Sequence, residues 1–396
     1  MKKLIFYIGL FFVMIFLTTG CSKSGGYYRS GKNYFISGDY HKAAENFSLS
    51  ITKNPNKAEY YIDYGMALIG LGQYQEAFVQ FDKVIMDKKI TIVLKNNKRA
   101  LRGKGIAYFM MQDFQEAINQ FDKALDINVL SELDLDILYY KGRALTNIGD
   151  FKEAAATYSR IIDQFGQDAQ VLADRAYTYH KSGEYVEGLN DYDKAITLQS
   201  DKFDYYFGKY YLLMDMGKPN EAQEVLRQAE EIKIITKADK YNLAKVHFYQ
   251  GLYDQAIYEL SESAGNGFVE ANFYIGEIYN HKKDYPTAKY YYEKYIEEGG
   301  VPLPWVYSQI ASCLMKTGEY KQAIPYLETG INYAHNDMKR ELLKSLIIVY
   351  ENLGDFENAL IKLESYLASY PGDEDAKREE IFLKSRTKEF STTNNP

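Results

Sequence analysis

Histidine and cysteine are the side chains in this chain that could bind a metal ion or act as nucleophiles. A helical zinc site needs two histidines one turn apart beside a glutamate. The five histidines are instead widely separated, at His41, His180, His247, His281 and His335. Gly103-Lys104-Gly105 lacks the third glycine of a dinucleotide-binding loop, and the chain has no P-loop and no GxSxG motif. The sequence therefore predicts no catalytic site, no metal site and no cofactor.

Tyrosine is unusually frequent, with 39 tyrosines among 396 residues. Its apolar ring and polar tip suit half-buried helix faces and binding surfaces equally. With 26% charged and 46% hydrophobic residues, the rest of the composition is ordinary for a folded protein. Binding through aromatic side chains is therefore more plausible than catalysis, and the elements that carry these side chains decide where it occurs.

A helical hairpin that recurs along the chain would position these side chains. In residues 138–162, Gly142 lies on a first helix, Ala154 and Tyr158 lie four apart on a second, and Gly149 breaks the chain between them. The unit repeats about every 34 residues. Its small second-helix position is filled by Ala43, Ala77, Ala117, Ala154, Gly188, Ala222, Ala256, Ala288, Ala323 and Ala359. One hairpin cannot bury both apolar faces alone, so the sequence predicts a stack of repeats.

Further columns keep the same register. An aromatic residue precedes the small position by three in every copy except at Pro219, and the first helix has glycine or alanine except at Tyr210 and Ile347. With Pro55 and Pro371 at the closing position, the pattern resembles the tetratricopeptide repeat family. The resemblance implies an all-α fold, a right-handed superhelical α-solenoid of about ten helix-turn-helix repeats. The eighth copy, residues 265–296, resembles the related Sel1-like variant.

The N-terminus has the pattern of an export signal. A basic start precedes a 14-residue apolar run, Leu4–Leu17, which is shorter than the roughly 20 residues of a spanning helix. The sequence from Leu17 to Cys21 resembles the lipobox of bacterial lipoproteins, although Thr18 stands where that motif usually has leucine. The resemblance implies acylation of the Cys21 thiol and stable anchoring to a bacterial membrane outside the cytoplasm.

Removal of the leader makes the chain more acidic. Residues 1–20 contain two lysines and no acids, so the mature net charge is 45 − 54 = −9. An acidic surface argues against a nucleic-acid partner. Cys313 is the one cysteine besides Cys21, and we predict that it is a packing residue.

We expect five segments: a signal peptide over 1–20, the lipidated Cys21 with a short linker over 21–26, the solenoid over 27–373, a capping helix over 374–390 and a disordered tail over 391–396. Two longer spacers, 87–97 and 127–136, are predicted to lengthen the first helices of the third and fourth repeats. The repeats leave no room for a hidden catalytic domain.

In the tetratricopeptide family the first helices line a concave groove. The resemblance places these residues in it: Phe35, Ile62, Met66, Arg99, Arg102, Phe109, Tyr139, Arg143, Tyr177, Phe207, Tyr211, Tyr241 and Phe248. Aromatic and arginine side chains dominate binding hot spots, so an extended peptide or a partner helix is the expected ligand. Burial of some of these residues between neighbouring helices stays open. The carboxylate clamp of chaperone-tail-binding members is not supported, because its places hold Tyr28, Lys32, Asp63, Arg99 and Gly103.

One basic cluster lies in the third repeat. It comprises Lys88, Lys89, Lys95, Lys98, Arg99, Arg102 and Lys104. Such a run is either a solvated helix face or an anion site for an acidic partner segment or lipid headgroups.

These features predict a membrane-anchored, non-enzymatic scaffold that binds a protein or peptide partner in its concave groove and serves assembly or regulation of a cell-envelope complex. The alternative is a surface lipoprotein for nutrient or glycan capture. Proteins of that kind carry large non-repeat insertions, which this chain lacks.

Overall fold

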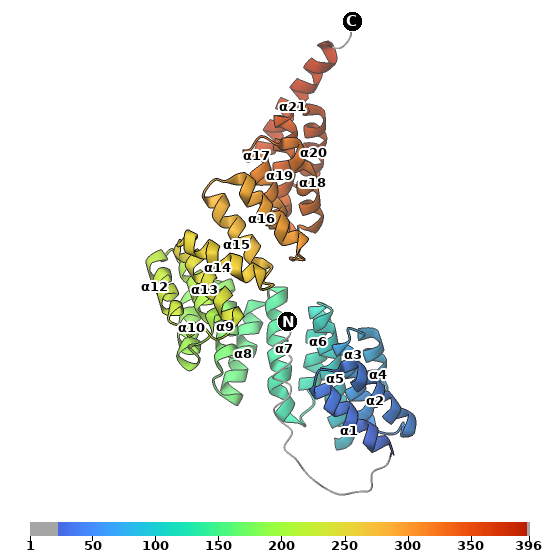
Figure 1. The fold of residues 1–396 in the computed structure, drawn as a ribbon. Coiled ribbons are helices and arrows are strands. Elements are labelled where there is room, and N and C mark those ends of the chain that lie inside the picture. Colours follow the sequence, from blue (N-terminus) through green and yellow to red (C-terminus); the bar gives the residue numbers. More distant parts are fainter. Residues whose placement is uncertain (1–22, 394–396) are drawn as a thin grey trace. The chain divides into compact units, whose positions relative to one another are not determined.

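The computed structural model describes residues 23–393, and every regular element in that range is helical (Figure 1). The predicted signal peptide over 1–20 and the lipidation site at Cys21 lie outside the described residues. No helix within the described range combines the length and the apolar character needed to cross a membrane. The prediction of an all-α solenoid is confirmed.

The helices divide into two compact units, and the boundary between them in the sequence falls between Ala222 and Gln223. The first unit contains α1 (Lys23–Ile36), α2 (Tyr40–Lys53), α3 (Ala58–Gly70), α4 (Tyr74–Asp82), α5 (Thr91–Met110), α6 (Phe114–Leu125), the 3-10 turn η2 (Ser131–Leu133), α7 (Asp134–Ile148), α8 (Phe151–Phe165), α9 (Ala169–Ser182), α10 (Tyr185–Leu198) and α11 (Phe203–Asp215). Helix α12 (Pro219–Glu230) crosses the division.

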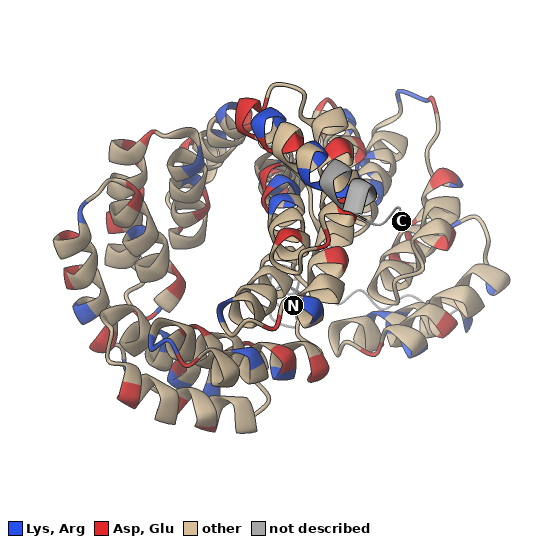
Figure 2. Ribbon diagram, turned by 90° about the horizontal axis from the view of Figure 1, so that it is seen from above, with Lys and Arg blue, Asp and Glu red and all other residues tan. Residues whose placement is uncertain are grey.

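The second unit continues the pairing of helices. It contains α13 (Lys237–Gln250), α14 (Tyr253–Gly265), α15 (Glu270–His281), α16 (Tyr285–Glu297), α17 (Pro304–Lys316), α18 (Tyr320–Tyr333), α19 (Asn336–Asn352), α20 (Phe356–Ser369) and α21 (Glu374–Thr393). Acidic and basic residues alternate along the helices of both units (Figure 2).

In the hairpin of α7 and α8, a Gly-Asp pair sets the turn. Gly149 ends α7 with φ of 80°, a left-handed conformation that glycine adopts without steric cost. The side chain of Asp150 then accepts a hydrogen bond from the backbone N–H of Glu153 and caps α8. Asp39, Asp113, Asp284 and Asp355 cap their helices in the same way.

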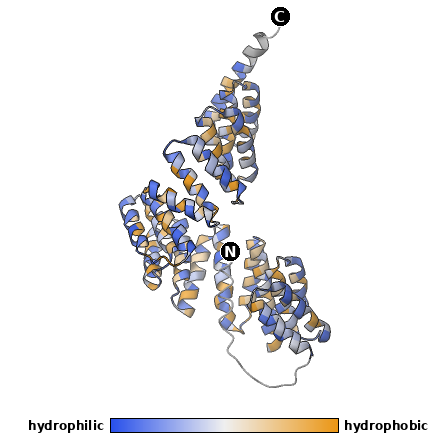
Figure 3. Cartoon of the chain, viewed as in Figure 1, coloured by the Kyte–Doolittle hydropathy of each residue, from blue (hydrophilic) through white to orange (hydrophobic). Residues whose placement is uncertain are grey.

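The two helices of a hairpin meet where an aromatic ring covers a glycine. A Cβ built on Gly142 would lie 2.8 Å from the ring of Tyr158, which is 1% exposed. Gly276 stands in the same relation to Tyr292, at 2.7 Å. The small position of the first helix is therefore a requirement of the ring opposite it. Figure 3 shows apolar and polar residues alternating along the helices that make these contacts.

Successive first helices also touch each other. In the first unit α3 contacts α5, α5 contacts α7, α7 contacts α9, and α9 contacts α11. We call α1, α3, α5, α7, α9 and α11 the first-helix layer of the first unit. In the second unit α13 contacts α15, and α17 contacts α19. In a curved stack, the layer whose members approach each other is the inner one.

The two long spacers, 87–97 and 127–136, adopt different structures. Helix α5 has 20 residues, so the prediction of a lengthened first helix in the third repeat is confirmed. The same prediction for the fourth repeat is wrong, because α7 begins only at Asp134. The buried ammonium of Lys98 explains the difference. It donates a hydrogen bond to Ile127 O at 2.9 Å and lies 2.5 Å from Asp134 Oδ1. These two contacts hold the segment between Ile127 and Asp134 as a loop.

Helix α21 covers the apolar side of α20, where Ala376 and Leu383 pack with Leu363 and Tyr366. Asp373 fixes the start of this helix. It caps the backbone N–H of Ala376, accepts a hydrogen bond from Tyr366 at 2.6 Å, and lies 2.8 Å from both Arg340 and Lys344.

Candidate binding surface

The thirteen predicted groove residues are divided between the two units. Eleven of them, from Phe35 to Tyr211, belong to the first unit, and Tyr241 and Phe248 lie on α13 in the second. The first-unit residues all come from helices of the first-helix layer. Each unit therefore presents its own set of side chains.

Three of these side chains are committed to the interior. Ile62 and Phe207 are buried, with 5% and 4% exposure, and the ring of Phe207 stacks on Phe203 at 6.3 Å. Arg102 forms an ion pair with Asp136 of α7, and this partner raises the pKa of the guanidinium against the opposing effect of burial. These side chains stabilise contacts between repeats. They are thus cases of the burial between neighbouring helices that the sequence left open.

The N-terminal part of the first-helix layer is only partly exposed. Phe35, Met66 and Phe109 are half-buried. Phe35 packs edge-on against Tyr40 at 5.4 Å, and Phe109 packs in the same way against Phe114. The two phenylalanine rings at these positions therefore pack against the next helix instead of standing free.

Much of the basic cluster pairs with acidic residues. Lys98 contacts Asp134, Arg102 contacts Asp136, and Lys104 lies 2.8 Å from Asp82. Half-buried Arg99 faces the carboxylate of Asp63, which accepts a hydrogen bond from the Tyr28 hydroxyl at 2.6 Å. Most of the positive charge of this helix is thus balanced inside the fold.

An open concavity of the first-helix layer lies where α7, α8 and α9 meet. It is a cavity of about 180 Å³, lined by Arg143, Thr146, Asn147, Tyr158, Asp174 and Tyr177. Two predicted groove residues, Arg143 and Tyr177, come together here, and Tyr139 lies close by. Tyr177 is 45% exposed and stands at the rim, with the ammonium of Lys181 5.5 Å from its ring centre.

Two residues of opposite charge, Arg143 and Asp174, line this cavity. The guanidinium of Arg143 lies over the rings of Phe109 and Tyr139, at 5.4 and 6.0 Å, which is a cation–π geometry. Burial raises the pKa of Asp174, while the neighbouring Tyr139 hydroxyl, the hydrogen bond from Gln170 and the charge of Arg143 favour its carboxylate. Burial and the Asp174 charge raise the pKa of Tyr139 in turn. Asp174 was not predicted, because the groove pattern is defined by exposed helix positions.

The second unit has an aromatic cluster on α13 and α15. Tyr241 stacks on Phe268 at 5.0 Å, and Phe248 packs edge-on against Tyr274 at 5.2 Å. The Lys245 ammonium lies 5.6 Å from the ring of Tyr241. Sequence reasoning missed Tyr274, because it does not occupy an offset that the family uses for its groove.

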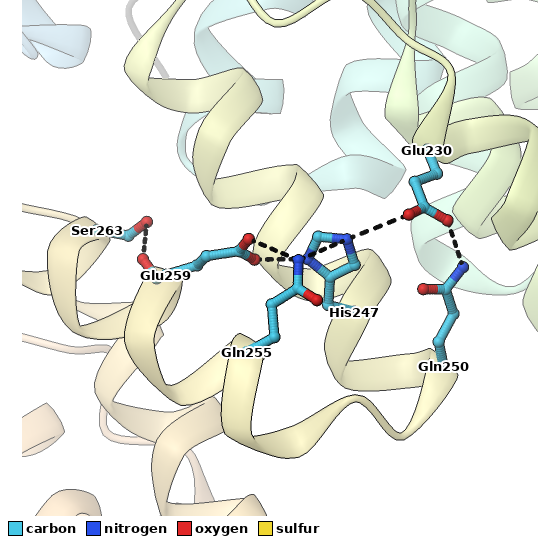
Figure 4. A network of polar contacts seen from close by, with 6 residues as sticks. All are labelled: Glu230, His247, Gln250, Gln255, Glu259 and Ser263. Carbon is cyan, nitrogen blue, oxygen red and sulfur yellow. Dashed lines mark hydrogen bonds and ion pairs between the residues drawn. The ribbon is translucent and has the colours of Figure 1, made fainter.

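A polar network in the same unit joins α12, α13 and α14 (Figure 4). His247 is 3% exposed, and its Nδ1 lies 2.5 Å from Glu259 while its Nε2 lies 3.6 Å from Glu230. Gln250 donates to Glu230, and Gln255 donates to Glu259. The network connects consecutive helices, and no group of three potential metal ligands was found among the residues that the structure describes.

Comparison with known proteins supports the repeat assignment. One family model described as tetratricopeptide repeat matches residues 102–169, 139–205 and 241–300. A second model with the same description matches 306–337. The matched part includes α7, α8 and α9, which form the cavity. The Sel1-like character of the eighth repeat stays a prediction.

Curated relatives are distant and longer. Hsp70-Hsp90 organizing protein 3 of Arabidopsis thaliana is 25% identical over an alignment of 218 positions, which covers 48% of this chain and 39% of the relative. TPR repeat-containing protein YpiA of Bacillus subtilis is 26% identical over an alignment of 212 positions, which covers 50% of this chain and 47% of the relative. The chain thus spans less than half the length of these relatives.

A solved structure extends the similarity in fold over most of the chain. The crystal structure of yeast Tom70 aligns with a TM-score of 0.52 at 16% identity, and the alignment covers 94% of this chain and 90% of that one. At this identity the similarity concerns the fold alone. The chain is thus an α-solenoid in fold, and residues 102–205, 241–300 and 306–337 match the tetratricopeptide repeat.

Proposed function

We propose that the chain is a non-enzymatic scaffold that binds a protein or peptide partner on the first-helix layer of its first unit. The observation that carries this proposal is the cavity between α7, α8 and α9, with the exposed ring of Tyr177 at its rim. Tyr211, on the next helix of the layer, is 41% exposed. Exposed tyrosines beside a cavity are typical anchors for a protein ligand.

The relatives agree with a role of this kind. Proteins named as organizing Hsp70 and Hsp90 are among those that match this chain. Nutrient capture is less well supported, since the longest helix-free connector among the described residues is the short segment 83–90.

We propose further that Cys21 carries lipid and holds the chain on a bacterial membrane, outside the cytoplasm, where it serves a cell-envelope complex. The support is the apolar leader and the lipobox-like sequence that ends at Cys21. Metabolic labelling with a fatty acid tests the anchor: Cys21→Ser should lose the label, and equal labelling of both proteins would contradict it.

Crosslinking in cells tests the binding surface. A photo-crosslinking amino acid at Tyr177 or Tyr211 should capture a defined partner. The matched control is Val186, which is 71% exposed but lies on a second helix, α10. Equal capture from Val186, or no capture from either tyrosine, would contradict the proposal.

A further inference from the structure

The cavity between α7, α8 and α9 contains two buried polar atoms with no hydrogen-bond partner. Arg143 Nη1, from α7, is one, and Asp174 Oδ2, from α9, is the other. Both residues line the cavity. The three helices lie side by side in Figure 1 and contact one another within the first unit. A buried polar group without a hydrogen-bond partner lowers the stability of the fold. Two such groups in one cavity therefore indicate that a ligand with matching polar atoms should enter it.

Three other polar atoms of the cavity lining have partners within the protein. Asn147 Nδ2 donates to the carbonyl of Arg143 at 2.8 Å, and Thr146 Oγ1 donates to the carbonyl of Gly142 at 2.9 Å. Asp174 Oδ1 accepts from Gln170 at 2.9 Å. The unused capacity is therefore a donor on Arg143 and an acceptor on Asp174.

The size of the cavity limits what it can hold. Its volume of about 180 Å³ is below the roughly 300–1,000 Å³ of a pocket for a whole small molecule. It is also about six times the roughly 30 Å³ that one water occupies in the liquid. A single amino-acid side chain fits between these limits.

Charge selects among side chains. A carboxylate ligand would be repelled by Asp174, and an ammonium or guanidinium ligand would be repelled by Arg143. A primary carboxamide satisfies both groups, because its oxygen accepts and its NH₂ donates. An apolar side chain would leave both atoms without partners.

We propose that this cavity is a specificity pocket for an asparagine or glutamine side chain of the bound partner, an inference that rests on the proposed function. The ligand carbonyl accepts a hydrogen bond from Arg143 Nη1, and the ligand amide donates to Asp174 Oδ2. The ring of Tyr177 covers the adjoining peptide at the rim.

Selection of a random nonapeptide library on the full chain tests the pocket. Peptides bound by the unmodified protein should be enriched about tenfold in asparagine or glutamine at one position, since hydrogen bonds to charged groups discriminate by at least that factor. Recovered peptides without this enrichment would overturn the pocket and leave the binding surface standing. A failure to recover any peptide would overturn both.

Two variants that nearly preserve side-chain volume sharpen the test. Asp174→Asn leaves Arg143 as the one charge among the lining residues, so the enrichment should move to glutamate or aspartate. Arg143→Met leaves Asp174 alone, so the enrichment should move to lysine or arginine. Matched controls are Glu187→Gln and Arg160→Gln, which change exposed charges on α10 and α8 and should keep the amide preference. Unchanged preference in both pocket variants, with helicity retained, would overturn the assignment.

Discussion

Replacement of Gly105 by alanine tests the packing rule of the hairpins. Gly105 lies inside α5, where alanine is intrinsically more favourable than glycine by about 1 kcal/mol. The new Cβ would lie 2.4 Å from the ring of Phe121, which is completely buried and has no room to retreat. Overpacking of this kind costs about 1–3 kcal/mol. The collision should therefore outweigh the gain in helix propensity, and Gly105→Ala should lower the free energy of unfolding by up to about 2 kcal/mol.

Gly26→Ala is the matched control. Gly26 lies in α1, and nothing stands within 4 Å of the position its Cβ would take. This substitution should leave the stability of the protein unchanged or raise it, because it changes only the helix propensity of the residue. Both substitutions replace glycine by alanine in a helix. Their effects on the free energy of unfolding should differ in sign, because only Gly105 lies under an aromatic ring.

Local stability is the quantity to measure, because repeat arrays need not unfold in a single step. Amide hydrogen exchange should show faster opening of α5 and α6 in Gly105→Ala, together with a lower urea midpoint. Adding Phe121→Leu should restore part of the loss, since it removes the colliding ring atoms. If Gly105→Ala stabilised the protein as Gly26→Ala does, the proposed ring-over-glycine contact would be refuted.

Three further predictions concern buried polar groups. Lys98→Met should destabilise the first unit by about 3 kcal/mol in urea unfolding, because it leaves the Asp134 carboxylate without its buried partner. Burial and the neighbouring Glu379 raise the pKa of Glu351 to about 7, so the docking of α21 should weaken as pH rises from about 5 to about 8. Hydrogen exchange of α21 should show this dependence, and Glu351→Gln should abolish it. Burial raises the pKa of the Cys313 thiol to about 11, so Cys313 should react with a thiol reagent at pH 8 only after unfolding.

The hairpins could be predicted from the sequence because their determinants are local and periodic. Gly142, Gly149 and Tyr158 recur at fixed spacing, and each has one structural task that the spacing reveals. The burial of Cys313 was predicted correctly for the same reason, since it lies in the apolar stripe of α17.

The candidate surface was harder to predict because it depends on contacts between repeats. The family's set of groove offsets combines positions that are exposed here, such as Tyr177 and Tyr211, with positions that neighbouring helices bury, such as Phe207. The loop before α7 is not periodic, so the pairing of Lys98 with Asp134 could not be read from the repeat. The polar lining of the cavity combines residues from different repeats, and no single motif contains both Arg143 and Asp174.

The most direct test of the account is hydrogen exchange of the full chain with and without the partner captured from Tyr177. The partner should protect α7, α9 and α11, which form one layer, while α10 exchanges at its former rate. Protection confined to α8 and α10, or no protection in the first unit, would contradict the claim that the first-helix layer is the binding surface.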